Sequence, residues 1–367
     1  MEIDKLQTIV SQFDIEGQLA EIHPITSGLI NDTYLVRILE KGMSDYILQH
    51  INNQVFQDVD LLMNNILDVT KHIRKKLEER HTQDIDRHVL SFIKLKDCDK
   101  YYLDDNGNYW RMMIYISDSV TKNEVNPSTS YNVGIAFGDF QAMLADIPEK
   151  LGETIPNFHN MEFRLKQLQE AIKEDKAQRF SGIKDLVDKI LVTADDMCRG
   201  ERLFREGKLP KRICHCDTKV NNVLLDKQDN ILCVIDLDTV MPNFVFSDIG
   251  DFLRYAANTS HEDERDLDKV NFNFSIFKAF IRGYLERANK FLLPIEIENI
   301  PYAAELFPYM QAVRFLTDYL NGDTYYKISY PEHNLVRTLA QFKLYRSVCD
   351  HEAQMQAFVR ECLFGKK

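Results

Sequence analysis

The chain has 367 residues, of which 44% are hydrophobic and 28% are charged, a balance typical of a globular protein with a sizeable buried core. Its 45 Lys and Arg against 57 Asp and Glu give a net charge of −12. That charge argues against a nucleic acid or an anionic membrane surface as the partner. It does not argue against a small anionic ligand, which needs only a local positive potential.

The sequence shows no pattern typical of a membrane span or of a secretory signal. No apolar run reaches the roughly 18 residues of a span. Residues 1–20 mix acidic with apolar residues, and this pattern predicts an amphipathic helix. The segment lacks the basic start of a signal peptide. The seven Cys follow no regular framework, which favours reduced thiols. We therefore expect a cytoplasmic protein, with a monomer as the working assumption.

The first third of the chain is rich in short apolar segments that predict strands. These segments are 33–39, 45–51, 88–96 and 109–116. The turn-like EKGMSD between the first two predicts a hairpin, and LDDNGN precedes the last. A helix is predicted over 61–80 from its apolar spacing.

The composition changes after residue 117, where the polar, turn-rich segment 117–130 predicts a linker. Helical apolar spacing then predominates, at 133–147, 163–175 and 183–197 and again after residue 247. We expect an α+β fold with a β-rich N-terminal lobe over 1–117, a hinge at about 115–130, and a larger helical lobe over 118–367.

Within the helical part, residues 213–240 read ICHCDTKVNNVLLDKQDNILCVIDLDTV. The apolar runs 222–226 and 231–236 are joined by KQDN and predict an antiparallel hairpin. Asp217 lies five residues before Asn222, and Asp236 ends the second run. The loop and the strand end can therefore meet at one edge of the hairpin, as phosphoryl transfer requires.

The spacing His-x-Asp-x-x-x-x-Asn matches the catalytic loop of the protein kinases. In that interpretation Asp217 is the base that accepts the proton of the attacking hydroxyl, and Asn222 and Asp236 hold Mg²⁺. Lys219 lies two residues after the base and could contact the acceptor or the transferring phosphoryl group, and a surface lysine is the less favoured alternative. GxGxxGxV, VAIK and APE, the other protein-kinase signatures, are absent.

The arrangement instead resembles the aminoglycoside phosphotransferase and choline kinase group, which shares the kinase fold and acts on small molecules. Within it, the segments HCDTKVNNVLLD, VIDLDTVMP, SDIGDFLR, ILQHINNQVF and RFLTDYLNGDTYYK are similar to those of the N-acetylhexosamine 1-kinases. The resemblance implies a protein-kinase-like two-lobe fold and dependence on ATP and Mg²⁺. It also implies phosphorylation of the anomeric (C1) hydroxyl of N-acetylglucosamine (GlcNAc) or N-acetylgalactosamine (GalNAc).

On the nucleotide side, SGLINDTYLV (27–36) occupies the position of the phosphate-covering turn of a kinase lobe. With a single glycine in this segment, a phosphate cradle has to come from Ser27, Gly28, Asn31 and Thr33.

The lysine expected on the third strand of a kinase lobe is missing, because YILQHIN offers only Gln49 and His50 there. Either another basic residue replaces it, or Mg²⁺ and backbone N–H groups suffice. The backbone at Tyr115, Ile116 and Ser117 lies where a kinase hinge bonds adenine.

On the acceptor side, Asp238 could accept a sugar hydroxyl or support the metal site, and the sequence leaves both open. The resemblance implies that Arg314 and Tyr325 belong to the sugar pocket. Asp248 and Asp251 are expected to support the catalytic loop rather than to bind substrate.

Two alternatives stay open at the level of sequence. One is a phosphotransferase for another small hydroxylated substrate, such as a different sugar, an aminoglycoside or choline. Cationic acceptors call for a carboxylate-lined pocket, so Arg and Lys near the acceptor would count against them. The other is a catalytically dead nucleotide-binding module, against which the joint presence of Asp217, Asn222 and Asp236 argues.

Overall fold

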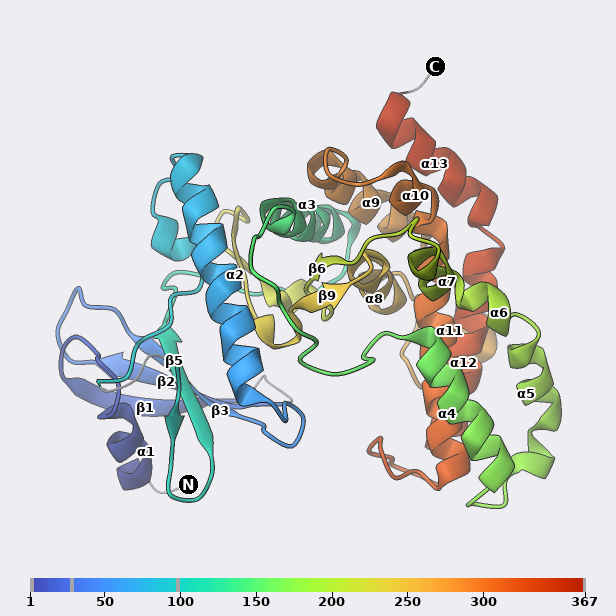
Figure 1. Cartoon of the computed structure of the whole chain (residues 1–367), viewed down its shortest axis with the longest axis horizontal. Helices are drawn as coiled ribbons and strands as arrows, with labels where there is room; N and C mark the ends of the chain where they lie inside the picture. The colour runs from blue at the N-terminus through green and yellow to red at the C-terminus, as the bar shows by residue number, and fades with distance from the viewer. Residues whose placement is uncertain (1–2, 27–29, 97–99, 366–367) are drawn as a thin grey trace. The chain divides into compact units, whose positions relative to one another are not determined.

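The computed structural model describes residues 3–26, 30–96 and 100–365, and it confirms the predicted α+β fold with a β-rich N-terminal part and a helical C-terminal part (Figure 1). The chain divides into two compact units. The sheet-bearing unit comprises Met1–Lys122, Asp146–Pro156 and Asn221–Met241. The helical unit comprises Asn123–Ala145, Asn157–Val220 and Pro242–Lys367.

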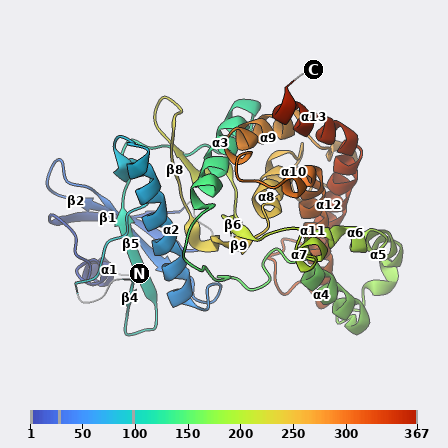
Figure 2. The same cartoon turned by 45° about the horizontal axis from the view of Figure 1, so that its top comes forward.

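The sheet-bearing unit is built on a five-stranded antiparallel sheet in the order β1-β2-β3-β5-β4. Its strands are β1 (Leu19–Ile25), β2 (Asp32–Ile38), β3 (Tyr46–Ile51), β4 (Tyr102–Leu103) and β5 (Tyr109–Ile114). The predicted hairpin of 33–39 with 45–51 is confirmed as β2 and β3. Helix α2 (Val59–Glu79) lies along the sheet in both views, and its Met63 contacts Arg111 of β5 (Figures 1 and 2).

Two predictions for this unit were wrong. The first helix, α1, covers only Ile3–Val10, and β1 follows where the helix was expected to continue. The segment 88–96 is not a continuous strand and has isolated bridges only, from Phe92 to Met113 and from Leu95 to Phe13. Its apolar pattern reflects burial, because Ile93 and Leu95 pack against the core cluster under α1.

A second, two-stranded sheet of the same unit is the predicted hairpin, with β7 (Val223–Leu225) antiparallel to β8 (Ile231–Val234). Val223 pairs with Val234, and the Ile235 N–H donates to the Asn222 carbonyl oxygen at 2.9 Å. Asn222 and Asp236 therefore flank the same end of the hairpin.

The helical unit contains most of the helices (Figure 2). They are α3 (Pro127–Leu144), α4 (Met161–Glu174), α5 (Lys184–Leu191), α6 (Ala194–Met197), α7 (Arg199–Arg205), α8 (Phe246–Ala256), α9 (Phe274–Ala288), α10 (Pro294–Glu298), α11 (Ile300–Asn321), α12 (His333–Cys349) and α13 (Glu352–Phe364). In the described part of the chain no helix is both long and apolar enough to cross a membrane.

Two helix boundaries differ from the predicted ones. Helix α3 begins inside the predicted linker, because Asn126 and Thr129 form a capping box around Pro127 at the first turn. The predicted helix 183–197 is broken into α5 and α6. Its apolar spacing does not reveal the break, because Val187 and Met197, on either side of it, are both buried.

Helices α3 and α9 approach each other closely because glycines line their contact. A Cβ added at Gly134 would lie 2.2 Å from the Phe280 carbonyl oxygen, and one added at Gly283 would lie 2.2 Å from that of Tyr131. Such distances exclude any side chain unless the backbone moves. The close approach brings Gln141 of α3 against Tyr284 of α9, whose hydroxyl donates to it.

Candidate active site

The predicted base and its neighbouring lysine form an ion pair in the helical unit. They follow β6 (Arg212–Cys214), and Lys219 Nζ lies 2.6 Å from Asp217 Oδ1. The side chains are 42% and 25% exposed respectively, so both can meet a ligand. Lys219 thus places a positive charge beside the carboxylate that would accept the proton.

The backbone of the predicted catalytic loop, residues 215–222, is held by a buried carboxylate. Asp248, in the first turn of α8, accepts the N–H of His215 at 3.0 Å and that of Cys216 at 2.8 Å. Cys216 has a φ of 64°, in the left-handed region that a non-glycine residue seldom adopts. Paired acceptance by one carboxylate offsets the cost of this conformation and fixes the loop just before Asp217.

The Asp248 carboxylate is itself held from behind by α3. Gln141 Nε2 donates to Asp248 Oδ2 at 2.5 Å, and the hydroxyl of Tyr284 donates to Gln141 Oε1. Burial raises the pKa of Asp248, and the loop N–H groups and Gln141 oppose that shift by stabilising the charge. The network connects the packed pair α3 and α9 to the catalytic loop.

A second carboxylate holds the residue after the base. Asp251 Oδ2 accepts the Thr218 N–H at 2.9 Å, as was expected of a supporting residue. Burial and the nearby charge of Asp217 raise the pKa of Asp251 to about 6. The ring of His215 is fully buried and packs edge-on against Phe137 and Phe140.

The two predicted metal ligands belong to the sheet-bearing unit, at one end of the β7–β8 hairpin. Asn222 is 5% exposed, whereas Asp236 is exposed and has a φ of 61°. A carboxylate and an amide supply the oxygen donors that Mg²⁺ prefers, and phosphate oxygens and waters ordinarily complete its octahedron. The pair therefore fits Mg²⁺ bound with a nucleotide. Over the described ranges no group of three or more His, Cys, Asp or Glu is placed to hold a metal ion.

Asp238 lies in the same unit and binds two side chains, and the sequence analysis predicted neither contact. Arg111 Nη2 lies 2.6 Å from Asp238 Oδ1, and Asn31 Nδ2 donates to Asp238 Oδ2 at 2.6 Å. The Arg111 and Asp238 side chains are only 3% and 5% exposed. Asp238 thus links the predicted phosphate loop to strand β5. Ser27 and Gly28, predicted for the same loop, lie outside the described residues.

The lysine that was expected on β3 is absent, and the adjacent strand β5 has an arginine, Arg111, opposite Gln49. Gln49 accepts a hydrogen bond from Arg111 Nε at 2.9 Å and donates to the Thr33 hydroxyl at 3.2 Å. Arg111 is the single charged residue in the apolar strand YWRMMI, and this irregularity was the sequence signal that could have revealed it.

The predicted hinge backbone follows β5. The Tyr115 N–H donates to the Asp45 carbonyl oxygen at 2.9 Å, and the Ile116 carbonyl oxygen accepts from the Ser119 hydroxyl at 2.6 Å. Ile116 is 6% exposed. Its carbonyl keeps a second lone pair for a ligand, whereas the Tyr115 N–H is already used.

The two predicted sugar residues lie near each other in the helical unit. Arg314, on α11, donates to Gln311 Oε1 at 3.1 Å and sits 5.6 Å from the ring centroid of Tyr326. Tyr325 packs edge-on against Tyr326, at 4.8 Å between ring centroids, and is 74% exposed. Tyr326 therefore connects Arg314 to Tyr325, a role that the sequence did not indicate.

Sequence reasoning also missed two neighbours of Arg314, namely Arg164 and His159. Burial and the charge of Arg314 lower the pKa of Arg164 to about 10, and the same two causes push the pKa of His159 well below its usual range. His159 stacks on Phe158, and its Nδ1 is buried without a hydrogen bond. Throughout the described residues neither Arg314 nor Arg164 has a carboxylate within ion-pair distance.

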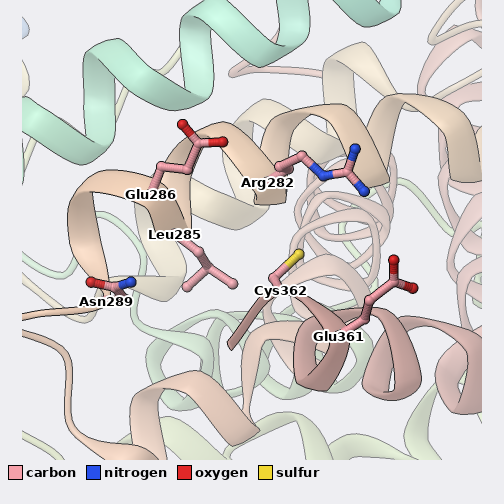
Figure 3. Close-up of a pocket in the computed structure, with 6 residues that line it drawn as sticks. All are labelled: Arg282, Leu285, Glu286, Asn289, Glu361 and Cys362. Carbon is pink, nitrogen blue, oxygen red and sulfur yellow. The ribbon is translucent and has the colours of Figure 1, made fainter. Parts of the chain in front are cut away.

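A separate cavity of about 270 Å³ lies between α9 and α13 of the helical unit (Figure 3). It is lined by Arg282, Leu285, Glu286, Asn289, Glu361 and Cys362. None of these residues belongs to the catalytic loop or to the Arg314 cluster, so this cavity has no part in the candidate site.

Comparison with known proteins decides the family. The model of a phosphotransferase enzyme family matches residues 21–274, more than half of the chain. The chain belongs to this phosphotransferase family. The matched range contains the catalytic loop, the hairpin and both supporting carboxylates of α8, and it ends before Arg314 and Tyr325. Membership therefore shows a phosphotransferase and leaves the acceptor unspecified.

Solved structures share the fold of this phosphotransferase over nearly its whole length at low identity. An aminoglycoside phosphotransferase from Alicyclobacillus acidocaldarius aligns over 97% of this chain and 96% of its own, with TM-score 0.60 and 12% identity. A spectinomycin phosphotransferase bound to ADP and spectinomycin aligns over 96% and 99%, with TM-score 0.58 and 10% identity. An ethanolamine kinase from Plasmodium vivax aligns over 91% and 84%, with TM-score 0.52 and 17% identity.

Proposed function

We propose that this phosphotransferase is an ATP-dependent kinase that phosphorylates the anomeric (C1) hydroxyl of an N-acetylhexosamine, GlcNAc or GalNAc. The observation that carries the proposal is the Arg314 cluster. Arg314 and Arg164 have no carboxylate partner among the described side chains, and they lie with the aromatic Tyr325 and Tyr326. Such a surface offers donors and ring faces to sugar hydroxyls and an acetamido group.

The same cluster disfavours cationic acceptors. Choline, ethanolamine and aminoglycosides carry positive charge, and Arg314 and Arg164, neither of which has a carboxylate partner among the described side chains, would repel a like charge placed near them. The proposal therefore separates this chain in substrate from the kinases whose fold it shares.

On the catalytic side, Asp217 orients the acceptor hydroxyl and takes its proton as the oxygen attacks the γ-phosphorus of ATP, while the bond from that phosphorus to the β,γ-bridging oxygen breaks and ADP leaves. Lys219, in contact with Asp217, supplies positive charge near the transferring phosphoryl group. Use of ATP is supported by the ADP in the spectinomycin phosphotransferase of the same fold. Mg²⁺, held by Asn222 and Asp236, would neutralise phosphate charge.

The rest of the nucleotide site follows from this assignment. Asn31 and Thr33 are proposed to contact phosphate together with Ser27 and Gly28, and the backbone at Tyr115 and Ile116 to meet adenine. Asp238 is proposed to face the acceptor with one edge while Arg111 and Asn31 hold it.

The test is release of ADP from ATP and Mg²⁺ with one acceptor at a time: GlcNAc, GalNAc, glucose, choline, ethanolamine and an aminoglycoside. We expect turnover with the two N-acetylhexosamines and none with the amines. The product should have acid-labile phosphate and no reducing end. A 6-phosphate, which keeps its reducing end, or turnover with an amine alone, would overturn the proposal.

A further inference from the structure

The loop that carries Tyr325 and Tyr326 is tied to α11 by one buried carboxylate. Asp318, 4% exposed, accepts the N–H groups of three successive residues. Oδ1 accepts from Thr324 at 2.9 Å and from Tyr325 at 2.8 Å, and Oδ2 accepts from Tyr326 at 2.9 Å. Hydrogen bonds to a charged acceptor are the stronger kind, so the peptide units that bear both tyrosines are fixed.

A second buried side chain completes this arrangement from α12. Asn334 is fully buried, and its Nδ2 donates to Asp318 Oδ2 and to Asp323 Oδ1, both at 2.9 Å. Asp323 in turn pairs with Arg179 at 2.5 Å. The amide thus bridges two carboxylates that would otherwise repel each other.

The turn that starts the loop is also determined locally. Gly322 ends α11 with a φ of 92°, and the Asp323 N–H reaches back to the Asp318 carbonyl oxygen at 2.8 Å. This is the left-handed glycine ending of a helix, which reverses the chain in a defined direction. Asp318 therefore holds the loop through its backbone and its side chain together.

What this arrangement presents is an exposed tyrosine, Tyr325, beside the half-buried Tyr326. Tyr325 remains 74% exposed although its backbone is fixed, and Tyr326 carries the guanidinium of Arg314 over its ring. Packing of a hydrophobic core does not require buried polar groups such as Asp318 and Asn334 beneath an exposed ring. Fixing recognition groups before the ligand arrives lowers the entropy lost on binding.

We propose that Asp318 and Asn334 are positioning residues for the acceptor, which set Tyr325 and the Arg314–Tyr326 pair in the geometry that binds the sugar. The inference rests on the proposed function, because it assigns the loop to acceptor binding. It adds that acceptor affinity depends on two residues that do not touch the acceptor.

The experiment compares Asp318→Asn, Asn334→Ala and the control Asn321→Ala. Asn321 is the last residue of α11, beside the same loop, and its side chain makes no hydrogen bond in the described structure. We expect the first two variants to raise KM for the N-acetylhexosamine about tenfold, with kcat and KM for ATP within about twofold of wild type. The control should match wild type.

Hydrogen–deuterium exchange supplies a readout that needs no substrate. The amides of residues 324–326 should exchange at least about tenfold faster in Asp318→Asn and Asn334→Ala, while the amides of α9 keep their protection. Unchanged exchange at 324–326 would overturn the inference. Faster exchange at 324–326 with an unchanged acceptor KM would also overturn it. So would a fall in kcat together with a rise in KM for both the acceptor and ATP, because that result indicates a merely structural role.

The two proposals fail separately. If wild type uses neither hexosamine, the proposed function falls, and the KM comparison is made with whichever acceptor of the panel it does phosphorylate. A rise in that KM confined to the two variants would support the positioning role, and no rise would overturn it. Should Asp318→Asn not fold, Asn334→Ala, which removes no charge, decides the result.

Discussion

Lys219 Nζ lies 2.6 Å from Oδ1 of Asp217, so the residue that would take the proton and a residue that would meet the phosphoryl group touch each other. The pair is partly exposed, and a surface pair of this kind contributes at most about 1 kcal/mol to stability. The pair therefore adds little to the stability of the fold, and under the proposed function its role is to position charge for the reaction.

Replacing Asp217 with Asn keeps the shape of the side chain and removes the proton acceptor. We expect kcat to fall by about 10²–10⁴, the usual contribution of a general base, while nucleotide binding is retained. Steady-state kinetics together with calorimetric titration of an ATP analogue measure both quantities. Near-normal turnover would refute the assignment of the base.

Replacing Asp236 with Ala removes the exposed carboxylate at the end of the β7–β8 hairpin. Activity that depends on Mg²⁺ should be abolished, because phosphate charge loses its counter-ion at the transition state. Activity is followed as Mg²⁺ is raised, with nucleotide binding as the parallel measurement. A defect that Mg²⁺ does not alter, with normal nucleotide binding, would count against a metal role.

Arg314→Ala and Tyr325→Phe test the acceptor site directly. Both should raise KM for the N-acetylhexosamine and leave KM for ATP nearly unchanged, since a bond made equally in ground and transition states is lost through KM. The cost per hydrogen bond should be about 0.5–1.5 kcal/mol, and more for the charged Arg314. A shift in KM for ATP of similar size would place these residues elsewhere.

Arg111→Met leaves the Asp238 carboxylate buried without its cation. The free energy of unfolding should fall by about 3–5 kcal/mol, the usual cost of removing one partner of a buried pair. Urea denaturation gives this quantity. The double variant Arg111→Met/Asp238→Asn should recover much of the loss, and a double variant as unstable as the single one would show that the charge on Asp238 is not the cause.

The raised pKa of Asp251 predicts that the free energy of unfolding depends on pH. Because its pKa in the folded protein is raised from 3.8 to about 6, the folded state binds the proton more tightly than the unfolded state. Its contribution is therefore most favourable below pH 4 and is lost as pH rises through about 6, by up to about 3 kcal/mol. Asp251→Asn keeps an acceptor for the Thr218 N–H and should remove this slope.

The measurement is urea unfolding of wild type and Asp251→Asn from pH 4 to 7, compared as a difference so that other titrating groups cancel. The variant should gain stability relative to wild type as pH rises. A difference that does not depend on pH would show that Asp251 titrates alike in both states.

The sequence revealed those parts of the site that depend on short separations along the chain. Asp217, Asn222 and Asp236 lie within one loop and hairpin, so their spacing was enough to predict the hairpin and to place both metal candidates at its end. The same holds for strands β2 and β3, whose turn and alternation are local.

Contacts between distant segments were beyond such reasoning. Arg111 meets Asp238 only because segments far apart in the chain pack together, and Asp318 meets Asn334 only because the consecutive helices α11 and α12 pack against each other. The prediction for the segment 88–96 was wrong because burial alone produces its apolar alternation, and its backbone makes only isolated bridges, to Met113 of β5 and to Phe13. The spacing of apolar residues along the chain indicates which residues are buried, whereas the tertiary structure determines which residues they contact.

The close approach of α3 and α9 has a consequence for variation in this protein. Gly134 and Gly283 let the backbones of α3 and α9 nearly touch, and Gln141 of α3 contacts both Tyr284 of α9 and Asp248 of α8. Adding one methyl group at either glycine would push the helices apart and withdraw an amide from the carboxylate that shapes the catalytic loop. Such a substitution would lower turnover although it lies in no ligand's reach. In a screen for inactive variants, these two glycines should therefore appear alongside Asp217, and the cause would be helix spacing rather than chemistry.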